Sequence, residues 1–311
     1  MRSGRHNAGL PRLGQPLDPA TRNLLITVQL AFGVFPWLGK LAMVEFEPRA
    51  VLLWRLAAGT AVLGAFAAMR HGKAVWPGWR ALPGLFLLSV LGITVNQLLF
   101  LEGLARSHAT NAGLLMCVIP MATTGAALIA GQERPTTRRL LGIGLAVAGV
   151  AWMFMSRGAG LGGESALGDL LMTLNCVSYS LYLVLGKPVM ARIPRAVVIA
   201  WMFAFGLATV PWFSLNVAWV PAAATATHWA ALGGILAGPT VFAYLANAVV
   251  LNRTSASTTA VYVMLQPLIA AALGIGLLGE RPSPSLFVTA VCVLGGLWLV
   301  STPGQRARAA A

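Results

Sequence analysis

Acidic residues are scarce in this chain. Only 8 of its 311 residues are Asp or Glu, and charged residues of both signs make up 10%, against roughly 25% in an ordinary globular domain. Hydrophobic residues account for 58%. So little charge cannot keep so much apolar side chain in water, which excludes an ordinary soluble domain and predicts a polytopic membrane protein.

Cysteine and histidine are also rare. The three cysteines, Cys117, Cys176 and Cys292, all lie in apolar runs, which is typical of thiols that fill a core and not of a disulfide framework. The four histidines form no pair at helical spacing and no Cys/His cluster, and the chain has neither an Asp-rich nor a His-Glu metal motif. The sequence therefore predicts no metal site, no cofactor and no enzyme activity.

Positive charge is in excess, with 22 Lys and Arg residues and a formal net charge of +14. Nucleic-acid-binding proteins share this balance, but here the basic residues are spread over many short loops and form no single stripe. In membrane proteins, cationic residues gather in cytoplasmic loops beside anionic headgroups. We therefore predict that these residues face membrane lipid, and that the protein does not bind nucleic acid.

Ten apolar segments are long enough to cross a hydrocarbon core of about 30 Å, which takes about 20 residues. The predicted fold is therefore all-α, with ten transmembrane helices at residues 23–44, 49–69, 82–103, 109–130, 138–156, 167–187, 195–216, 229–251, 256–279 and 284–302. The connections are too short for a soluble domain. Residues 1–22 are predicted to form a polar tail and not a cleaved secretory signal, and residues 303–311 form a second tail.

The distribution of Lys and Arg predicts an orientation. With ten spans, sixteen of these residues fall on the side of the two termini and five on the opposite side, while Arg55 lies within a span. Positive residues favour the cytoplasmic side. We therefore expect a multi-pass protein of the cell's inner (plasma) membrane with both termini in the cytoplasm.

The sequence repeats itself at an offset of 147 residues. Matching pairs include Lys40 and Lys187, Trp54 and Trp201, Gly59 and Gly206, Arg106 and Arg253, and Pro120 and Pro267. Each copy holds five spans, and an odd number forces the second copy to enter the membrane upside down. Inverted repeats are typical of secondary transporters with a substrate site between the halves, although a duplication that only enlarged a scaffold would leave the same pattern.

Several of these motifs also resemble a known family. The second span opens with Trp54 and Arg55, and the fourth runs from Ala109 through Pro120 to the run Glu-Arg-Pro at 133–135. The same pattern recurs from Ala256 through Pro267 to Glu-Arg-Pro at 280–282. Together they resemble the EamA-type branch of the drug/metabolite transporter superfamily.

The resemblance implies two EamA-like five-helix repeats, which we assign to residues 23–156 and 167–302, joined by a linker at 157–166. It also implies an exporter of small metabolites, such as amino acids, with a central cavity between the halves. The second repeat has Met202 where the first has Arg55, so any role of that arginine belongs to one half only.

Polar and aromatic side chains inside the spans are candidates for a substrate site, because an unpaired polar group in hydrocarbon is costly. Asn175, Tyr179 and Tyr182 share one face of the sixth span. We expect a cavity for a small neutral or zwitterionic solute, although hydrogen bonds between helices and aromatic anchors at the interface would explain the same residues. The candidates are Gln29, Phe32, Asn96, Gln97, Asn175, Tyr179, Tyr182, Tyr244, Asn247, Tyr262 and Gln266.

The acids fall in loops or near span ends, so no mid-membrane proton relay is predicted. Arg55, in contrast, lies about two turns inside the second span. Glu102, at the end of the third span, is the carboxylate predicted at a comparable depth. We predict an Arg55–Glu102 ion pair that gates the outer mouth, with snorkelling of Arg55 to the headgroups as the alternative.

These observations predict a secondary transporter that exports amino acids or related small metabolites by alternating access. A passive channel or a structural membrane subunit is the alternative. A channel would need a continuous polar stripe, whereas the polar residues here gather around the middle of the spans.

Overall fold

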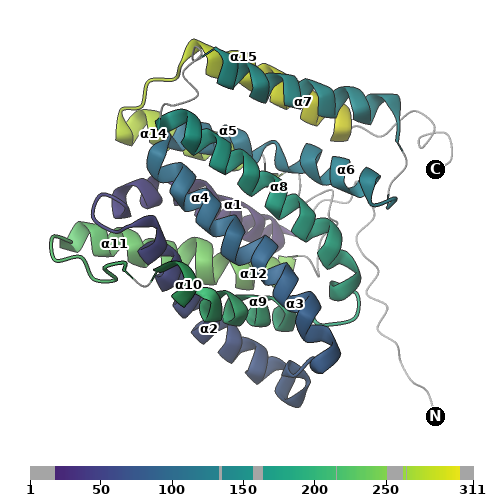
Figure 1. Cartoon of the computed structure of the whole chain (residues 1–311), viewed down its shortest axis with the longest axis vertical. Helices are drawn as coiled ribbons and strands as arrows, with labels where there is room; N and C mark the ends of the chain where they lie inside the picture. The colour runs from purple at the N-terminus through teal and green to yellow at the C-terminus, as the bar shows by residue number, and fades with distance from the viewer. Residues whose placement is uncertain are drawn as a thin grey trace.

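The fold is given by a computed structural model, which describes residues 18–132, 135–156, 164–214, 216–250, 262–263 and 265–301. Within these ranges the chain forms helices, turns and loops and no strand, so the all-α prediction is confirmed. The helices, drawn in Figure 1, are α1 (Pro19–Ala42), α2 (Pro48–His71), η1 (Gly72–Val75), η2 (Trp79–Ala81), α3 (Leu82–Ser89), η3 (Val90–Thr94), α4 (Val95–Arg106), α5 (Ala109–Met116), α6 (Ile119–Ile129), α7 (Thr137–Met155), α8 (Glu164–Met190), α9 (Arg195–Thr209), α10 (Pro211–Ser214), α11 (Ala226–Ile235), η4 (Leu236–Phe242), α12 (Ala243–Val250), α14 (Leu265–Leu278) and α15 (Pro284–Ser301).

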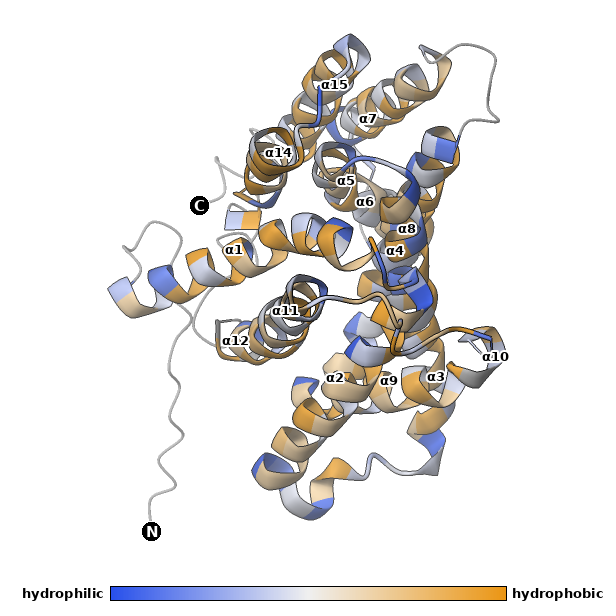
Figure 2. Cartoon of the chain, turned by 90° about the vertical axis from the view of Figure 1, so that its left-hand side faces the viewer, coloured by the Kyte–Doolittle hydropathy of each residue, from blue (hydrophilic) through white to orange (hydrophobic). Residues whose placement is uncertain are grey.

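Seven helical segments in the described residues are long and apolar enough to cross a membrane, and they match the first six and the eighth predicted spans. The seventh, ninth and tenth spans correspond to the shorter apolar helices Arg195–Thr209, Leu265–Leu278 and Pro284–Val300. Large apolar side chains such as Met69, Trp212 and Val291 point outward, and Figure 2 shows the helices hydrophobic along most of their length. A polytopic membrane protein is therefore confirmed, while ten complete crossings stay a prediction.

Local sequence explains where the first helices begin and end. Pro19 and Pro48 open α1 and α2, positions where the missing N–H of proline costs no helical hydrogen bond. The Asp18 carboxylate accepts the Thr21 N–H at 2.9 Å and caps α1. Gly72, with φ of +54°, ends α2 in a conformation that other residues rarely adopt.

Three spans are interrupted. The fourth breaks at residues 117–118 between α5 and α6, with Pro120 in the first turn of α6, a position that needs no N–H. The third and eighth contain the π-helical segments η3 and η4, which occupy repeat-related positions at the offset of 147. Such segments are frequent at functional sites, and each lies next to polar candidate residues.

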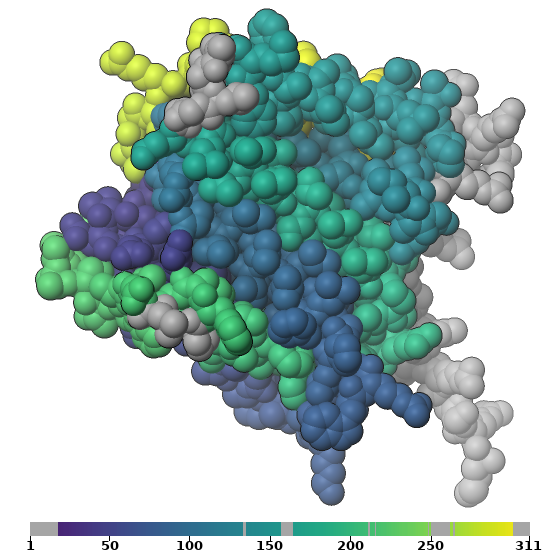
Figure 3. Space-filling view, viewed as in Figure 1, coloured from purple at the N-terminus to yellow at the C-terminus, as the bar shows by residue number. Residues whose placement is uncertain are grey.

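The packing follows the repeat. The first half pairs with the second as α2 with α9, α7 with α15, α3 and α4 with α8, and α1 with α11 and α12. The α7–α15 pair forms one edge of the bundle in Figures 1 and 2, and on the face in Figure 3 α4 and α8 lie side by side across the middle. Every one of these pairs maps onto itself or onto another when the two halves are exchanged, as an inverted repeat requires.

Two tryptophans show the inversion directly. Trp54 donates its indole N–H to the Trp219 carbonyl at 3.0 Å, while its repeat mate Trp201 donates to the Val75 carbonyl at 2.8 Å. Each therefore bonds to a loop of the other half, at opposite ends of the α2–α9 pair. We call these the Glu102 end, which carries loops 43–47, 107–108 and 216–225, and the Trp76 end, which carries loops 72–78 and 191–194.

Candidate substrate site between the two halves

Arg55 of α2 is the charged centre of the candidate site. Its side chain is 3% exposed, so the guanidinium neither snorkels nor reaches bulk solvent. Nε donates to the Thr240 hydroxyl of η4 at 3.0 Å, and Cζ lies 4.2 Å from the centre of the Phe35 ring of α1, a cation–π distance. Nη1 is buried and has no hydrogen-bond partner among the described residues.

Beside this guanidinium, aromatic rings from both halves contact one another. Phe35 stacks on Phe100 of α4 at a centroid distance of 5.1 Å. Tyr244 of α12 meets Phe203 of α9 edge-to-face at 5.3 Å and Phe32 of α1 at 6.4 Å. Tyr244 is also within electrostatic range of Arg55. Five helices thus converge on one cluster, in the amphipathic arrangement typical of small-molecule sites.

Gln97 adds a second unsatisfied polar group. It is 5% exposed, and neither its amide nitrogen nor its amide oxygen has a partner among the described residues. It lies three residues from Phe100, on the same face of α4, and Phe100 stacks on the ring beneath Arg55. Buried amides are normally hydrogen-bonded, so Gln97 is a candidate for contact with a solute.

The tyrosine candidates lie partly buried near this cluster. Tyr179 and Tyr182 of α8 have ring centroids 5.4 Å apart, and both are within electrostatic range of Tyr244. Asn247 is half-buried one turn after Tyr244 on α12. Tyr262 is half-buried in the two-residue segment 262–263, where no contact places it in the cluster.

The remaining candidates join helices. Asn96 donates to the Asn175 carbonyl at 3.1 Å and Asn175 to the Asn96 carbonyl at 2.7 Å, which ties α4 to α8. Gln266 of α14 donates to the Gln29 side-chain oxygen of α1 at 2.6 Å. For these four residues the geometry favours the alternative of hydrogen bonds between helices.

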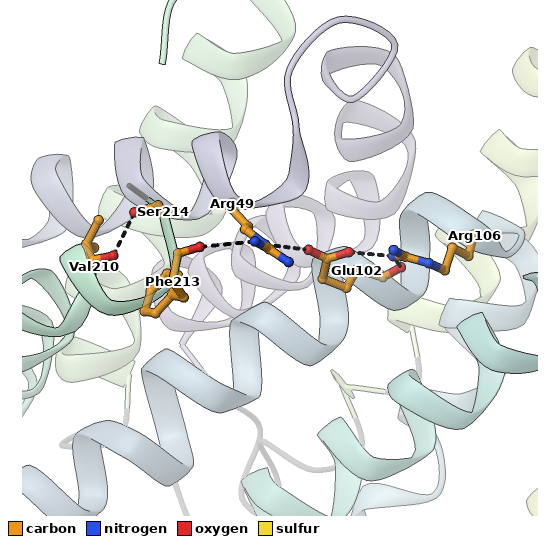
Figure 4. Close-up of polar contacts among 6 residues, drawn as sticks. All are labelled: Arg49, Glu102, Arg106, Val210, Phe213 and Ser214. Atoms are coloured by element: carbon orange, nitrogen blue, oxygen red, sulfur yellow. Dashed lines mark hydrogen bonds and ion pairs between the residues drawn. The ribbon is translucent and has the colours of Figure 1, made fainter. Parts of the chain in front are cut away.

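The predicted Arg55–Glu102 ion pair is wrong. Glu102 accepts from Arg49 Nε at 3.2 Å and from Arg106 Nη1, while Arg49 Nη1 also donates to the Phe213 carbonyl at 3.2 Å (Figure 4). The cause is depth: Arg49 is the second residue of α2, level with the end of α4, whereas Arg55 lies six residues, or about 9 Å, further along. The alternative of snorkelling is wrong as well, because Arg55 is buried.

Asp169, which the sequence placed near a span end, proves to be fully buried in the second turn of α8. Its carboxylate accepts from the Ser107 hydroxyl and from Asn111 Nδ2 at 3.1 and 3.2 Å. Beside it the backbones of Gly103 and Gly168 touch: a Cβ on either residue would lie 2.7 Å from the carbonyl oxygen of the other. The halves are therefore tightly joined here, at the Glu102 end.

Glu280 explains part of the Glu-Arg-Pro motif. Its carboxylate accepts the N–H groups of Ala109 and Thr110 at 2.7 and 2.9 Å. These are the first residues of α5, so an acid of the second half caps a helix of the first half, where backbone donors and the helix dipole favour negative charge. Glu133, the repeat mate of Glu280, lies outside the described residues.

Two hollows accompany these contacts. A polar recess of about 370 Å³ opens at the Glu102 end and is lined by residues that include Glu47, Arg49, Glu102 and Arg106. Beside Tyr244 lies a void of only about 10 Å³, room for at most one water. Arg55 is not among the residues that line the recess and is 3% exposed, so the recess does not reach it in this conformation.

In the part of the chain that the structure describes, no group of three or more His, Cys, Asp or Glu side chains is arranged to hold a metal. Cys117 and Cys176 are buried free thiols, and Cys292 is partly exposed. The unsatisfied chemistry of the site is therefore hydrogen bonding and charge, supplied by Arg55 and Gln97.

Comparison with known proteins agrees with this architecture. The chain is 26% identical over 281 residues, 89% of its length and 96% of the relative's, to an uncharacterized transporter of Archaeoglobus fulgidus. It is 27% identical over 210 residues, 58% of its length and 56% of the relative's, to a WAT1-related protein of Arabidopsis thaliana. A solved crystal structure with 19% identity matches with a TM-score of 0.60, over 94% of this chain and 98% of that one, which shows a shared fold.

The family predicted from the motifs is also found. The sequence model of the EamA-like transporter family matches twice, over residues 23–155 and 166–302. Together the two matches cover most of the chain, one on each of the two predicted repeats. The chain therefore belongs to the EamA-like transporter family.

Proposed function

We propose that the protein is a secondary transporter that exports an amino acid or a related small metabolite by alternating access between its two repeats. The observation that carries this proposal is the cluster around Tyr244, to which α1, α2 and α4 of the first repeat and α9 and α12 of the second contribute. A site built from both halves is the arrangement in which a rocking motion exposes a solute to each side in turn.

The contacts at the Glu102 end are those that rocking would break. The Asp169 bonds to Ser107 and Asn111 link α8 to the first repeat, and Glu280 links the loop after α14 to α5. None of these bonds is part of a helix ladder, so separating the halves leaves every helix intact. The described conformation is thus closed at this end, with the bonds available to re-form after each cycle.

The orientation follows from charge. With both termini in the cytoplasm of the inner membrane, as the Lys and Arg distribution indicates, the Glu102 end faces outward. His108 and Ala74 are exposed at opposite ends. We expect His108→Cys to react with an impermeant maleimide in intact cells, and Ala74→Cys to react only after lysis. The reverse pattern would overturn the orientation.

Membership of a transporter family implies transport and not catalysis. Within that class a passive channel is the alternative. The burial of Arg55 away from the polar recess favours a carrier, because a channel needs a continuous polar path.

Exchange kinetics separate the two classes. The full chain would be reconstituted in liposomes and loaded with each unlabelled amino acid in turn, and uptake of the same labelled amino acid would be followed. In a carrier, the internal unlabelled solute drives reorientation of the site, so labelled solute transiently rises inside the liposomes above its external concentration. In a channel, labelled solute only reaches the external concentration. Equilibration without transient accumulation, or no uptake beyond protein-free liposomes for any amino acid, would refute the proposal.

A further inference from the structure

Arg55 carries a positive charge that its surroundings only partly compensate. The Thr240 hydroxyl satisfies one of its donors and the Phe35 ring covers one face, but Nη1 is buried with no hydrogen-bond partner in the part of the chain that the structure describes. Both ion pairs in the described residues involve Glu102 and leave Arg55 out. A buried guanidinium without a counter-ion is strongly unfavourable unless a further group completes it.

None of the described acids forms an ion pair with Arg55. Glu45 and Glu47 lie in the loop before α2, at the Glu102 end, and Glu280 caps α5. Glu102 is paired with Arg49 and Arg106, and Asp169 accepts from Ser107 and Asn111. Each of these interactions lies at the Glu102 end and not at the depth of Arg55. A negative group that completes the guanidinium therefore has to come from outside the described chain.

We propose that Arg55 binds the carboxylate of the transported solute, a small molecule in which the carboxylate lies beside a second hydrogen-bonding group. This inference rests on the proposed transport function and names its substrate class. An arginine matches a carboxylate through two parallel N–H donors. Its Nε already bonds Thr240, so the open Nη1 is directed to the solute while Thr240 fixes the plane of the guanidinium.

Gln97 supplies the second contact. Its amide has a donor group and an acceptor without a partner among the described residues. It lies one turn before Phe100 on α4, and the Phe100 ring stacks on the Phe35 ring beneath Arg55. An ammonium or hydroxyl group next to the carboxylate would satisfy its oxygen. The aromatic rings around Tyr244 then face the apolar part of the solute.

The two repeats differ at the position of Arg55, so the proposed site has one cationic contact for the solute carboxylate. At the offset of 147, Arg55 and Thr240 correspond to Met202 and Ile93, and both of these are buried in the apolar core. The second half therefore offers no matching cation. A monoanionic solute fits one arginine, whereas a phosphate dianion would need a second positive group.

The test pairs each carboxylate with its own amide. Wild-type protein in liposomes is assayed for exchange of labelled amino acids and hydroxy acids. For the solute that is exchanged fastest, the same solute without label and its neutral carboxamide are then compared as inhibitors of that exchange. Because the amide keeps the shape and loses the charge, the concentration that halves exchange by the wild-type protein should be at least 30-fold lower for the carboxylate than for the amide.

Arg55→Gln should abolish this preference and leave carboxylate and amide equal within about threefold. Arg70→Gln is the matched control, because it makes the same substitution on an exposed residue of the same helix. Thr240→Val should weaken competition by the carboxylate and preserve its preference over the amide, since the guanidinium stays charged and loses only its positioning bond.

If Arg55→Gln does not fold, Gln97→Leu tests the same site, because leucine has a similar side-chain volume. This variant should weaken competition by the amino acid at least fivefold more than competition by the carboxylate that lacks the amino group. Exchange by the wild-type protein with no preference for the carboxylate, or a preference that survives Arg55→Gln, would overturn the inference and leave the proposed transport function standing. Absence of exchange for every carboxylate would overturn both.

Discussion

The contact between Gly103 and Gly168 predicts how the Glu102 end can be forced open. A Cβ on Gly103 would lie 2.7 Å from the Gly168 carbonyl oxygen and 2.7 Å from Met172 Cγ, where ordinary contact begins at 3.4 Å. The Met172 side chain can turn away, but the carbonyl oxygen belongs to α8 and cannot. Gly103→Ala therefore has to move α4 and α8 apart by several tenths of an ångström.

The magnitude follows from two opposing effects. Overpacking of a fitted contact costs about 1–3 kcal/mol, whereas replacing a helical glycine by alanine gains up to about 1 kcal/mol in helix propensity. Gly64 of α2 has nothing within 4 Å of its Cβ position, so Gly64→Ala reports the propensity gain alone. The difference in free energy of unfolding between the two variants should therefore be about 1–3 kcal/mol.

If the glycine contact exists only in the conformation closed at the Glu102 end, the same penalty shifts the conformational equilibrium. A bias of 1–3 kcal/mol corresponds to a change of about 5- to 150-fold in the population ratio. Ala112 of α5, 1% exposed near this end, offers a reporter: Ala112→Cys should react faster with an impermeant maleimide in the Gly103→Ala background than in Gly64→Ala. Equal rates would refute a closed state held by this contact.

Three further outcomes follow from the polar contacts. Asn111→Ala removes a donor from the buried Asp169 carboxylate, so thermal unfolding should show a loss of about 1–3 kcal/mol; an unchanged melting temperature would contradict the network. Glu280→Ala should lower stability by about 0.5–2 kcal/mol through loss of the α5 cap, with Glu280→Gln intermediate, and equal effects of the two would exclude a charge contribution. A double-mutant cycle of Arg49→Gln and Glu102→Gln should give a coupling below about 1 kcal/mol, because Arg49 is half-exposed; a coupling of several kcal/mol would mean a buried pair.

The features that the sequence predicted well are those set by one-dimensional patterns. Apolar length located the helices to within a few residues, because a helix in lipid has to satisfy its own backbone. The offset of 147 predicted inverted packing, which the Trp54 and Trp201 bonds display. The break at 117–118, just before Pro120, was not predicted, although proline cannot continue a helical ladder.

Partner choice could not be predicted, because it depends on helix rotation and depth. Arg55 was recognised as unusual, yet its partner Thr240 lies in the π-helical η4, where helical spacing no longer tells which side chain faces inward. The i,i+4 spacing of Glu102 and Arg106 favours their ion pair, and the prediction overlooks it. The contact of Glu102 with Arg49 depends on how α2 packs against α4, which the sequence does not reveal. Asp169 was missed as a buried group for the same reason: its place near a helix end concealed a tight crossing of α8 against α4.

The two repeats share a scaffold and differ in the chemistry placed upon it. Gly59 faces Phe203 of α9, and its mate Gly206 faces Leu56 of α2, so the same crossing is built twice with apolar atoms. The contact that Asn96 and Asn175 form with hydrogen bonds corresponds, at the offset of 147, to an apolar contact of Val28 with Ala243 in a small buried cluster. Where the residues at corresponding positions of both repeats are apolar, their contact serves packing. A polar pair in the same place costs little free energy only if every donor and acceptor is hydrogen-bonded. Arg55 breaks that rule: it is polar where its mate is methionine and it is not fully satisfied, so packing does not account for it.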